Sequence, residues 1–185
     1  MIFYRPIKPM FTTQGWGVEN DAYEQFGFTR HNGLDICTLE TPSYGLKPPI
    51  YAPTAGLKVI RVQYKPKGGG QELWMITKEP QWVQGALVHV LHVFFHNDKV
   101  LVPVGYEPAL GELVCVGDNT GFSTGPHLHW GTYRTDSLGT KIDVNEANGS
   151  FDPRPFLSEK HAIDQATLPT LIRSNLRYYK YKVGL

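Results

Sequence analysis

Seven histidines stand out in this chain of 185 residues, because imidazole is both a metal ligand and a proton carrier near neutral pH. Two of them form the segment His127-Leu128-His129, at the start of an apolar run with the composition of a strand. Residues two apart in a strand project from the same face, with Cα atoms about 6.6 Å apart. One imidazole can therefore bind a metal ion while the other stands beside it. The Gly-rich segment before the pair also favours a functional role.

A second pair, His31 and Asp35, lies four residues apart. In a straight strand the two would be about 13 Å apart, too far to share an ion bound at about 2.0–2.2 Å. Asn32-Gly33 between them is a turn dipeptide that can fold the chain and bring the side chains together. On this pair alone a simple surface turn, with Asp35 hydrogen-bonded to its own backbone, remains an alternative.

The third group is His89, His92 and His96. On a helix their spacing would place all three on one face as a rival metal site. The flanking β-branched and aromatic residues favour a strand instead. His92 then lies in mid-strand between apolar neighbours and is the candidate for an inward, functional position. We expect His89 and His96 to be structural or solvent-facing.

The elements that position these groups are mainly β. Gly and Pro total 33 residues (19 and 14), which predicts frequent turns. The first thirty residues predict an irregular, aromatic-rich segment that wraps around the domain. The apolar spacing over 163–181 predicts a short helix that Asp164 could cap. Runs of β-forming residues between turn residues predict strands at 33–37, 50–52, 57–64, 73–77, 86–95, 112–116 and 127–134.

Composition excludes several classes of protein. Eighteen Lys and Arg against seventeen Asp and Glu give a net charge of +1, so bulk electrostatics do not indicate binding to nucleic acid or to a membrane. No stretch is long and apolar enough to predict a membrane span, and the first residues lack the apolar run of a signal peptide. Two cysteines, Cys37 and Cys115, are too few for a disulfide framework. One bridge and two free thiols both remain open.

Taken together, the spaced motifs resemble those of the lysostaphin-type (LytM-like, M23) peptidases. The resemblance rests on His31-x-x-x-Asp35, a strand histidine, and His127-x-His129 after a Gly-rich segment, and it covers roughly residues 11–157. It implies a mainly β fold, a compact antiparallel sheet or β-barrel-like peptidase domain with long loops. We expect this domain at 1–157, including the wrap at 1–30, and a helical tail at 158–185 packed on it.

The resemblance also implies roles for residues. One Zn²⁺ would be held by His31, Asp35 and His129, which leaves the fourth tetrahedral position for water, as in catalytic zinc sites. His92 and His127 would act in catalysis, since histidine can serve as a general base near its own pKa. The chain departs from the family at Val90, because a tyrosine often lies two residues before the strand histidine.

The function implied is that of a zinc metalloendopeptidase that hydrolyses peptide bonds in the stems or cross-links of bacterial peptidoglycan. We expect a monomer that acts on the cell wall, outside the cell, in the periplasm or as a phage lysis or virion component such as an endolysin. Tyr44 and the segment 65–85 are the expected groove walls. The alternative is a non-catalytic peptidoglycan-binding or amidase-activator module of the same fold, but all five site positions are present, which favours the enzyme.

Overall fold

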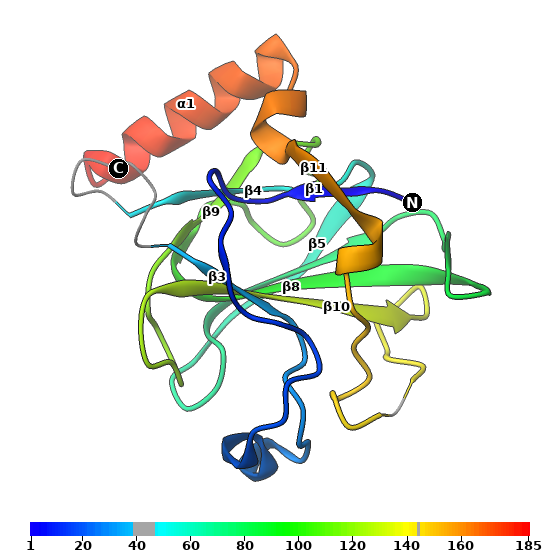
Figure 1. Cartoon of the computed structure of the whole chain (residues 1–185). Coiled ribbons are helices and arrows are strands. Elements are labelled where there is room, and N and C mark those ends of the chain that lie inside the picture. Colours follow the sequence, from blue (N-terminus) through cyan, green and yellow to red (C-terminus); the bar gives the residue numbers. More distant parts are fainter. Residues whose placement is uncertain (39–46, 144) are drawn as a thin grey trace.

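The structure is a computed structural model that describes residues 1–38, 47–143 and 145–185. Among these residues, nine strands form a mostly antiparallel sheet in the order β2-β3-β10-β8-β6-β5, with β7 and β9 paired to β8 and β4 paired to β9 (Figure 1). The strands are β2 (Thr12–Gln14), β3 (Leu34–Cys37), β4 (Pro49–Tyr51), β5 (Leu57–Lys65), β6 (Gly70–Thr77), β7 (Gln81–Val83), β8 (Ala86–Val100), β9 (Leu113–Gly117) and β10 (His127–Thr135).

The prediction of a mainly antiparallel β fold is confirmed, and each of the seven expected strands is present with its bounds within three residues at the start and five at the end. In the described residues the path from β2 to β5 does not close into a barrel. The sequence patterns missed four short strands: β2, β7, β1 (Phe3–Arg5) and β11 (Leu157–His161). Strands β1 and β11 pair in parallel as a separate two-stranded sheet.

The two faces of strand β10 have different roles. Leu128 and Trp130 point into the main hydrophobic core and are fully buried. Since side chains alternate along a strand, His127 and His129 lie on the other face. Strand β10 pairs with β3 on one side and β8 on the other. The core therefore fixes the strand that presents both histidines.

Strand β8 is long, and its regular alternation ends at His96. This residue has a left-handed backbone with φ of 63°, which is uncommon for a residue with a side chain. The pairing register with β6 shifts across the same stretch, between Leu73 and Gln71, as expected for a β-bulge. The bulge redirects the side chain of His96 relative to a straight strand.

The expected helix near the end of the chain is present as α1 (Leu168–Lys182), on the side of the molecule that carries β4, β9 and the β1–β11 pair (Figure 1). Thr167 is its N-cap residue and Pro169 lies in the first turn. The expected cap, Asp164, lies instead in the 3-10 helix η3 (Ala162–Gln165), where Lys8 Nζ donates to both carboxylate oxygens at 2.8 Å. The division of the chain into a domain and a tail at residue 157 stays a prediction.

Two short 3-10 helices complete the described structure: η1 (Asp21–Phe26) and η2 (Arg154–Phe156). Cys37 and Cys115 are both free thiols. None of the helices in the described residues is long and apolar enough to cross a membrane.

Candidate metal centre

Three side chains from two segments of the chain converge beside the β3–β10 pair. Strand register places Asp35 directly opposite His129. His31 precedes β3 and reaches the same point through the turn at Asn32-Gly33, as expected from the sequence. The nitrogen and oxygen atoms that these three side chains offer lie within 4.8 Å of one another. The surface-turn alternative for His31 and Asp35 is therefore wrong.

The contacts within this group suit a bound cation. Asp35 Oδ1 lies 3.0 Å from His31 Nε2 and 3.0 Å from His129 Nδ1, and the two nitrogens are 3.1 Å apart. Ligand atoms at bond lengths of about 2.0–2.1 Å in a tetrahedral site would be about 3.3 Å apart. Three electron-pair donors that crowd one point inside the protein are compatible with a metal ion there, which would satisfy all three at once.

The surroundings hold the imidazoles in the required orientation. The Nδ1 of His31 lies 2.8 Å from the Gly15 carbonyl oxygen, so that N–H donates to the carbonyl and Nε2 keeps its lone pair for a metal. A Cβ at Gly33 would lie 2.7 Å from the Trp130 carbonyl oxygen and 2.8 Å from His129 Nε2. Only glycine fits there, so this turn residue permits the close approach of His31 to β10.

Asp35 carries the negative charge of the group. Burial alone would raise the pKa of its carboxyl, but the adjacent His129 and His31 side chains outweigh burial, so the pKa is held well below its ordinary range. Asp35 is therefore a carboxylate at neutral pH. Two imidazoles and one carboxylate form a typical donor set for a divalent first-row metal ion.

His127 stands beside the group without being part of it. Its Nε2 lies 3.5 Å from Asp35 Oδ1. Its Nδ1 lies 2.8 Å from the Gly125 carbonyl oxygen, and Ser123 Oγ lies 3.2 Å away. Donation from Nδ1–H to that carbonyl leaves Nε2 as the free acceptor facing the metal position. The sequence predicted this placement from the His-x-His spacing.

His96 is the residue that sequence reasoning missed. Its ring centroid lies 4.6 Å from that of His127 and 6.1 Å from that of His129. Its Nδ1 lies 2.7 Å from the Thr120 carbonyl oxygen, so Nε2 is again the free nitrogen. A partial signal was present in the sequence, because the aromatic residue Phe94 lies two positions before His96, where the family often has a tyrosine.

His92 does not lie at this site, and its predicted place there is corrected by the structure. Its fully buried ring packs in the core, with centroid distances of 4.8 Å to Phe3 and 6.1 Å to Trp130. Trp130 Nε1 donates to its Nδ1 at 3.2 Å. Burial lowers the pKa of His92 to about 3, so it stays neutral. Register explains the error, because His92 shares the core-facing side of the sheet with Trp130 rather than the side of His129.

A cleft of about 800 Å³ opens over the cluster. One wall comes from the aromatic residues of the first thirty, in which the Tyr23 ring stacks on His31 at 5.8 Å. The turn at 65–69 and Trp74 form another wall, so the expected segment 65–85 contributes in part. Tyr44, the other expected wall residue, lies outside the described residues. His89 is structural, with Nδ1 at 2.7 Å from the Thr77 carbonyl oxygen.

Comparison with known sequences finds relatives among curated proteins, two of which are described here, and no matching family model. The chain is 32% identical over 100 residues to an uncharacterized metalloprotease of Haemophilus influenzae, which covers 54% of this chain and 18% of that protein. It is 29% identical over 112 residues to the glycyl-glycine endopeptidase ALE-1 of Staphylococcus capitis, with 59% and 25% covered. The chain thus spans a quarter or less of the length of these curated relatives.

Solved structures share the fold. The catalytic domain of the antimicrobial peptidase lysostaphin from Staphylococcus simulans superposes with a TM-score of 0.58 at 22% identity, covering 80% of this chain and 91% of that one. A zinc-containing peptidase from Vibrio cholerae superposes with a TM-score of 0.56 at 26% identity, covering 78% and 41%. The arrangement of the sheet is therefore that of lysostaphin-type domains.

Proposed function

We propose that the chain is a lysostaphin-type (LytM-like, M23) peptidase, a zinc-dependent endopeptidase that hydrolyses peptide bonds in bacterial peptidoglycan. Its sequence relatives and the solved structures that share its fold support this proposal. One observation carries the proposal: His31, Asp35 and His129 offer ligand atoms to a single point beneath an open cleft. Two further histidines, His96 and His127, face that point. A non-catalytic module would have no need of this second pair.

The three ligand residues would hold one Zn²⁺. Zinc bound by three protein groups supplies a water of lowered pKa and polarises a peptide carbonyl. The ordered contacts of His31 with Gly15 and of Asp35 with both imidazoles hold the ligands ready, so little rearrangement would be needed on binding.

His96 and His127 would move the protons. Each ring donates its Nδ1–H to a backbone carbonyl, which fixes the tautomer and leaves Nε2 able to accept a proton beside the metal position. One of the two would accept the proton of the attacking water at Nε2 and then pass that proton to the leaving amine. The other could donate to the oxyanion only in the form that is protonated at Nε2. His96 takes the role that the sequence assigned to His92, which lies in the core.

The cleft suits a slender peptide. Tyr23, Phe26 and Phe28 on one side and Trp74 on the other offer flat apolar walls, which accommodate backbone with small side chains such as glycine or D-alanine. One relative is named a glycyl-glycine endopeptidase, so a glycine-rich cross-link is one candidate substrate and a stem peptide is the other.

Digestion of purified peptidoglycans tests the proposal and identifies the bond. Sacculi with glycine cross-links and sacculi with direct cross-links are incubated with zinc-loaded protein, and the released fragments are analysed by mass spectrometry. We expect new amino termini at one defined peptide bond in at least one type. Binding to sacculi with no fragment from either type would contradict the enzyme and favour the non-catalytic module.

The setting follows from the substrate. We propose that the protein acts as a monomer on the cell wall, outside the cytoplasm or during phage lysis. Equilibrium sedimentation of the zinc-loaded protein measures the first point, and the genes that neighbour its own, such as a holin or tail gene, would distinguish a phage setting from a cellular one.

A further inference from the structure

Helix α1 carries its apolar side chains on the outside. Within the described residues, no side chain covers a stripe whose members recur every three or four positions and so share one helix face. The members and their exposed fractions are Leu168 (70%), Ile172 (59%), Leu176 (55%), Tyr179 (60%) and Val183 (48%). In soluble proteins such a stripe normally faces the core, whereas in this helix the apolar face is exposed.

The opposite face of α1 attaches to the sheet through polar groups. Ser174 is buried, and its Oγ accepts from the Leu113 amide at 2.9 Å. Arg177 Nη1 donates to the Leu113 carbonyl oxygen at 2.6 Å and to Glu112 Oε1 at 3.1 Å. Tyr181 donates to Asp98 Oδ2 at 2.8 Å. These contacts fix the rotation of the helix, so the apolar stripe is held outward by the fold.

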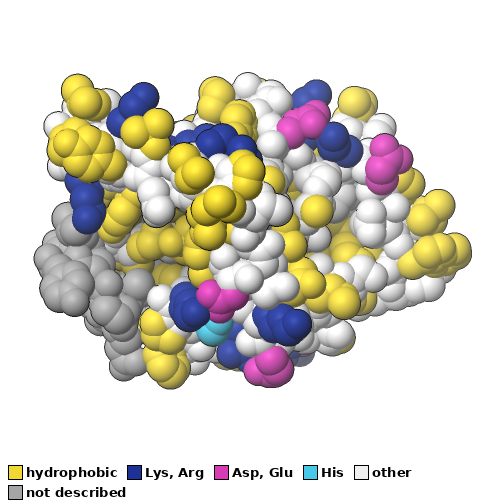
Figure 2. All heavy atoms as spheres, turned by 90° about the horizontal axis from the view of Figure 1, so that it is seen from above, with side chains coloured by type: hydrophobic (Ala, Val, Ile, Leu, Met, Phe, Trp, Pro, Cys, Tyr) yellow, Lys and Arg dark blue, Asp and Glu magenta, His cyan; other side chains and the backbone are white. Residues whose placement is uncertain are grey.

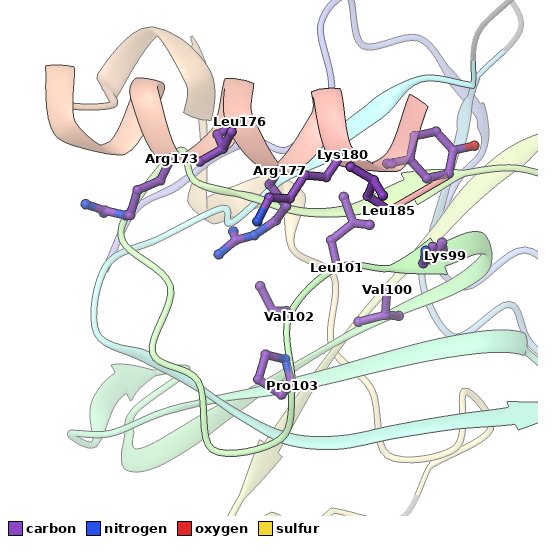
Figure 3. Close-up of a pocket in the computed structure, with 11 residues that line it drawn as sticks. Lys99, Val100, Leu101, Val102, Pro103, Arg173, Leu176, Arg177, Lys180 and Leu185 are labelled. Atoms are coloured by element: carbon purple, nitrogen blue, oxygen red, sulfur yellow. The ribbon is translucent and has the colours of Figure 1, made fainter. Parts of the chain in front are cut away.

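Basic side chains flank the stripe. Arg173, Lys180 and Lys182 are exposed on α1, and residues 165–185 contain no Asp or Glu. A groove beside the helix has a similar lining, with apolar Leu101, Val102 and Leu176 and basic Lys99 and Lys180 among its residues (Figure 3). The view onto this side of the molecule shows hydrophobic side chains interleaved with Lys and Arg (Figure 2). The near-zero net charge of the chain conceals this local excess.

We propose that this face docks on the surface of an anionic lipid bilayer. An apolar stripe bordered by cations is the pattern of helices that lie in the membrane interface, where each Lys or Arg is attracted by acidic headgroups. A second copy of the chain fits less well, because pairing two such helices would bring the cations of both copies together. Leu176 and Tyr179 would enter the acyl boundary while Lys180 and Lys182 meet the headgroups.

Vesicle sedimentation tests the proposal independently of any peptidase activity. We expect the protein to bind vesicles that contain phosphatidylglycerol and to bind phosphatidylcholine vesicles at least about tenfold more weakly. The double variant Ile172→Glu/Leu176→Glu should lower binding to the anionic vesicles by about tenfold or more. Lys180→Glu/Lys182→Glu should lower it similarly, and added salt should weaken the wild type.

Leu138→Glu is the matched control, because Leu138 is 83% exposed but lies in the turn after β10. It should bind anionic vesicles as the wild type does. Circular dichroism and thermal unfolding should be unchanged in all variants, since every substituted side chain is exposed. Absence of vesicle binding, or binding that survives Ile172→Glu/Leu176→Glu, would overturn the proposal. So would a wild-type dimer that this variant converts to a monomer, because the stripe would then join two copies.

Discussion

At the residue scale, Asp35 supplies the single negative charge of the proposed metal centre, and both ligand imidazoles contact it. Asp35→Asn keeps the shape but removes the charge. We expect the bound zinc, measured by elemental analysis after dialysis, to fall from about one ion per chain to well below one. Turnover should be lost with it. Asp21→Asn is the control, because Asp21 is an exposed acid on η1. Retention of a full zinc ion by Asp35→Asn would contradict the ligand assignment.

His96 and His92 offer a matched pair of substitutions on one strand. His96→Gln should keep the fold and the zinc but lower turnover by about 10²- to 10⁴-fold, because a proton carrier is removed. His92→Gln should stay within a few-fold of wild type per folded molecule, since its ring contacts Phe3 and Trp130 in the core. Initial rates on peptidoglycan, normalised to folded protein, measure both. A larger loss of rate in His92→Gln than in His96→Gln would contradict this assignment and indicate that His92 is the catalytic residue.

Residue spacing together with the family resemblance predicted four of the five positions that the structure brings together. His31, Asp35, His127 and His129 follow from turn chemistry and strand alternation, which are local properties. The choice between His92 and His96 was not local. It depends on a left-handed residue that breaks the alternation, and a period-2 pattern assumes that no such break occurs.

At the element scale, buried Glu112 ties α1 to the sheet. It accepts from Arg177 Nη1 at 3.1 Å, from Arg173 Nε at 3.3 Å and from the Ala109 amide at 3.0 Å. Glu112→Gln should lower the free energy of unfolding by about 2 kcal/mol at neutral pH, because hydrogen bonds to a charged group are lost. Urea unfolding of wild type, Glu112→Gln and the exposed control Glu79→Gln measures this. A loss no larger than that of the control would show that the pairs do not anchor the helix.

The same carboxylate predicts a pH dependence. Burial alone would raise the pKa of Glu112, but the hydrogen bonds from Arg173, Tyr106 and the Ala109 amide hold it below the ordinary value of 4.5. The charged form of Glu112 is thus favoured in the folded state. Its contribution to stability is fully present above pH 4.5 and is lost as the pH falls through the lower pKa of the folded state. The stability difference between wild type and Glu112→Gln should shrink as the pH is lowered below 4.5. A constant difference from neutral to acid pH would contradict this assignment.

Long strands were predictable, whereas of the short ones β3, β4 and β9 were recognised and β1, β2, β7 and β11 were not. Strands such as β8 and β10 contain enough apolar, β-forming residues to be recognised in sequence. Strands β1, β2 and β7 have three residues each, too few for a periodic pattern. Helix α1 was recognised from an apolar spacing that turns out to face outward, so the pattern predicted the helix correctly but not which side is buried.

At the scale of the whole molecule, the fold arranges two surfaces of different chemistry. The cleft lies over the histidine-bearing face of β10, with walls from the first thirty residues and from the turn between β5 and β6. The stripe and groove of α1 lie beside β9 and the chain that follows β8. Binding of the α1 face to a surface would therefore leave the contacts of the metal ligands unchanged.

The dependence of peptide-bond cleavage on zinc tests the central claim most directly. Protein stripped of metal by a chelator is titrated with zinc while peptidoglycan fragments are quantified by mass spectrometry. We predict that cleavage is absent in the stripped protein and returns in proportion to zinc until about one ion is bound per chain. Undiminished cleavage by protein from which the zinc has been removed would contradict the account.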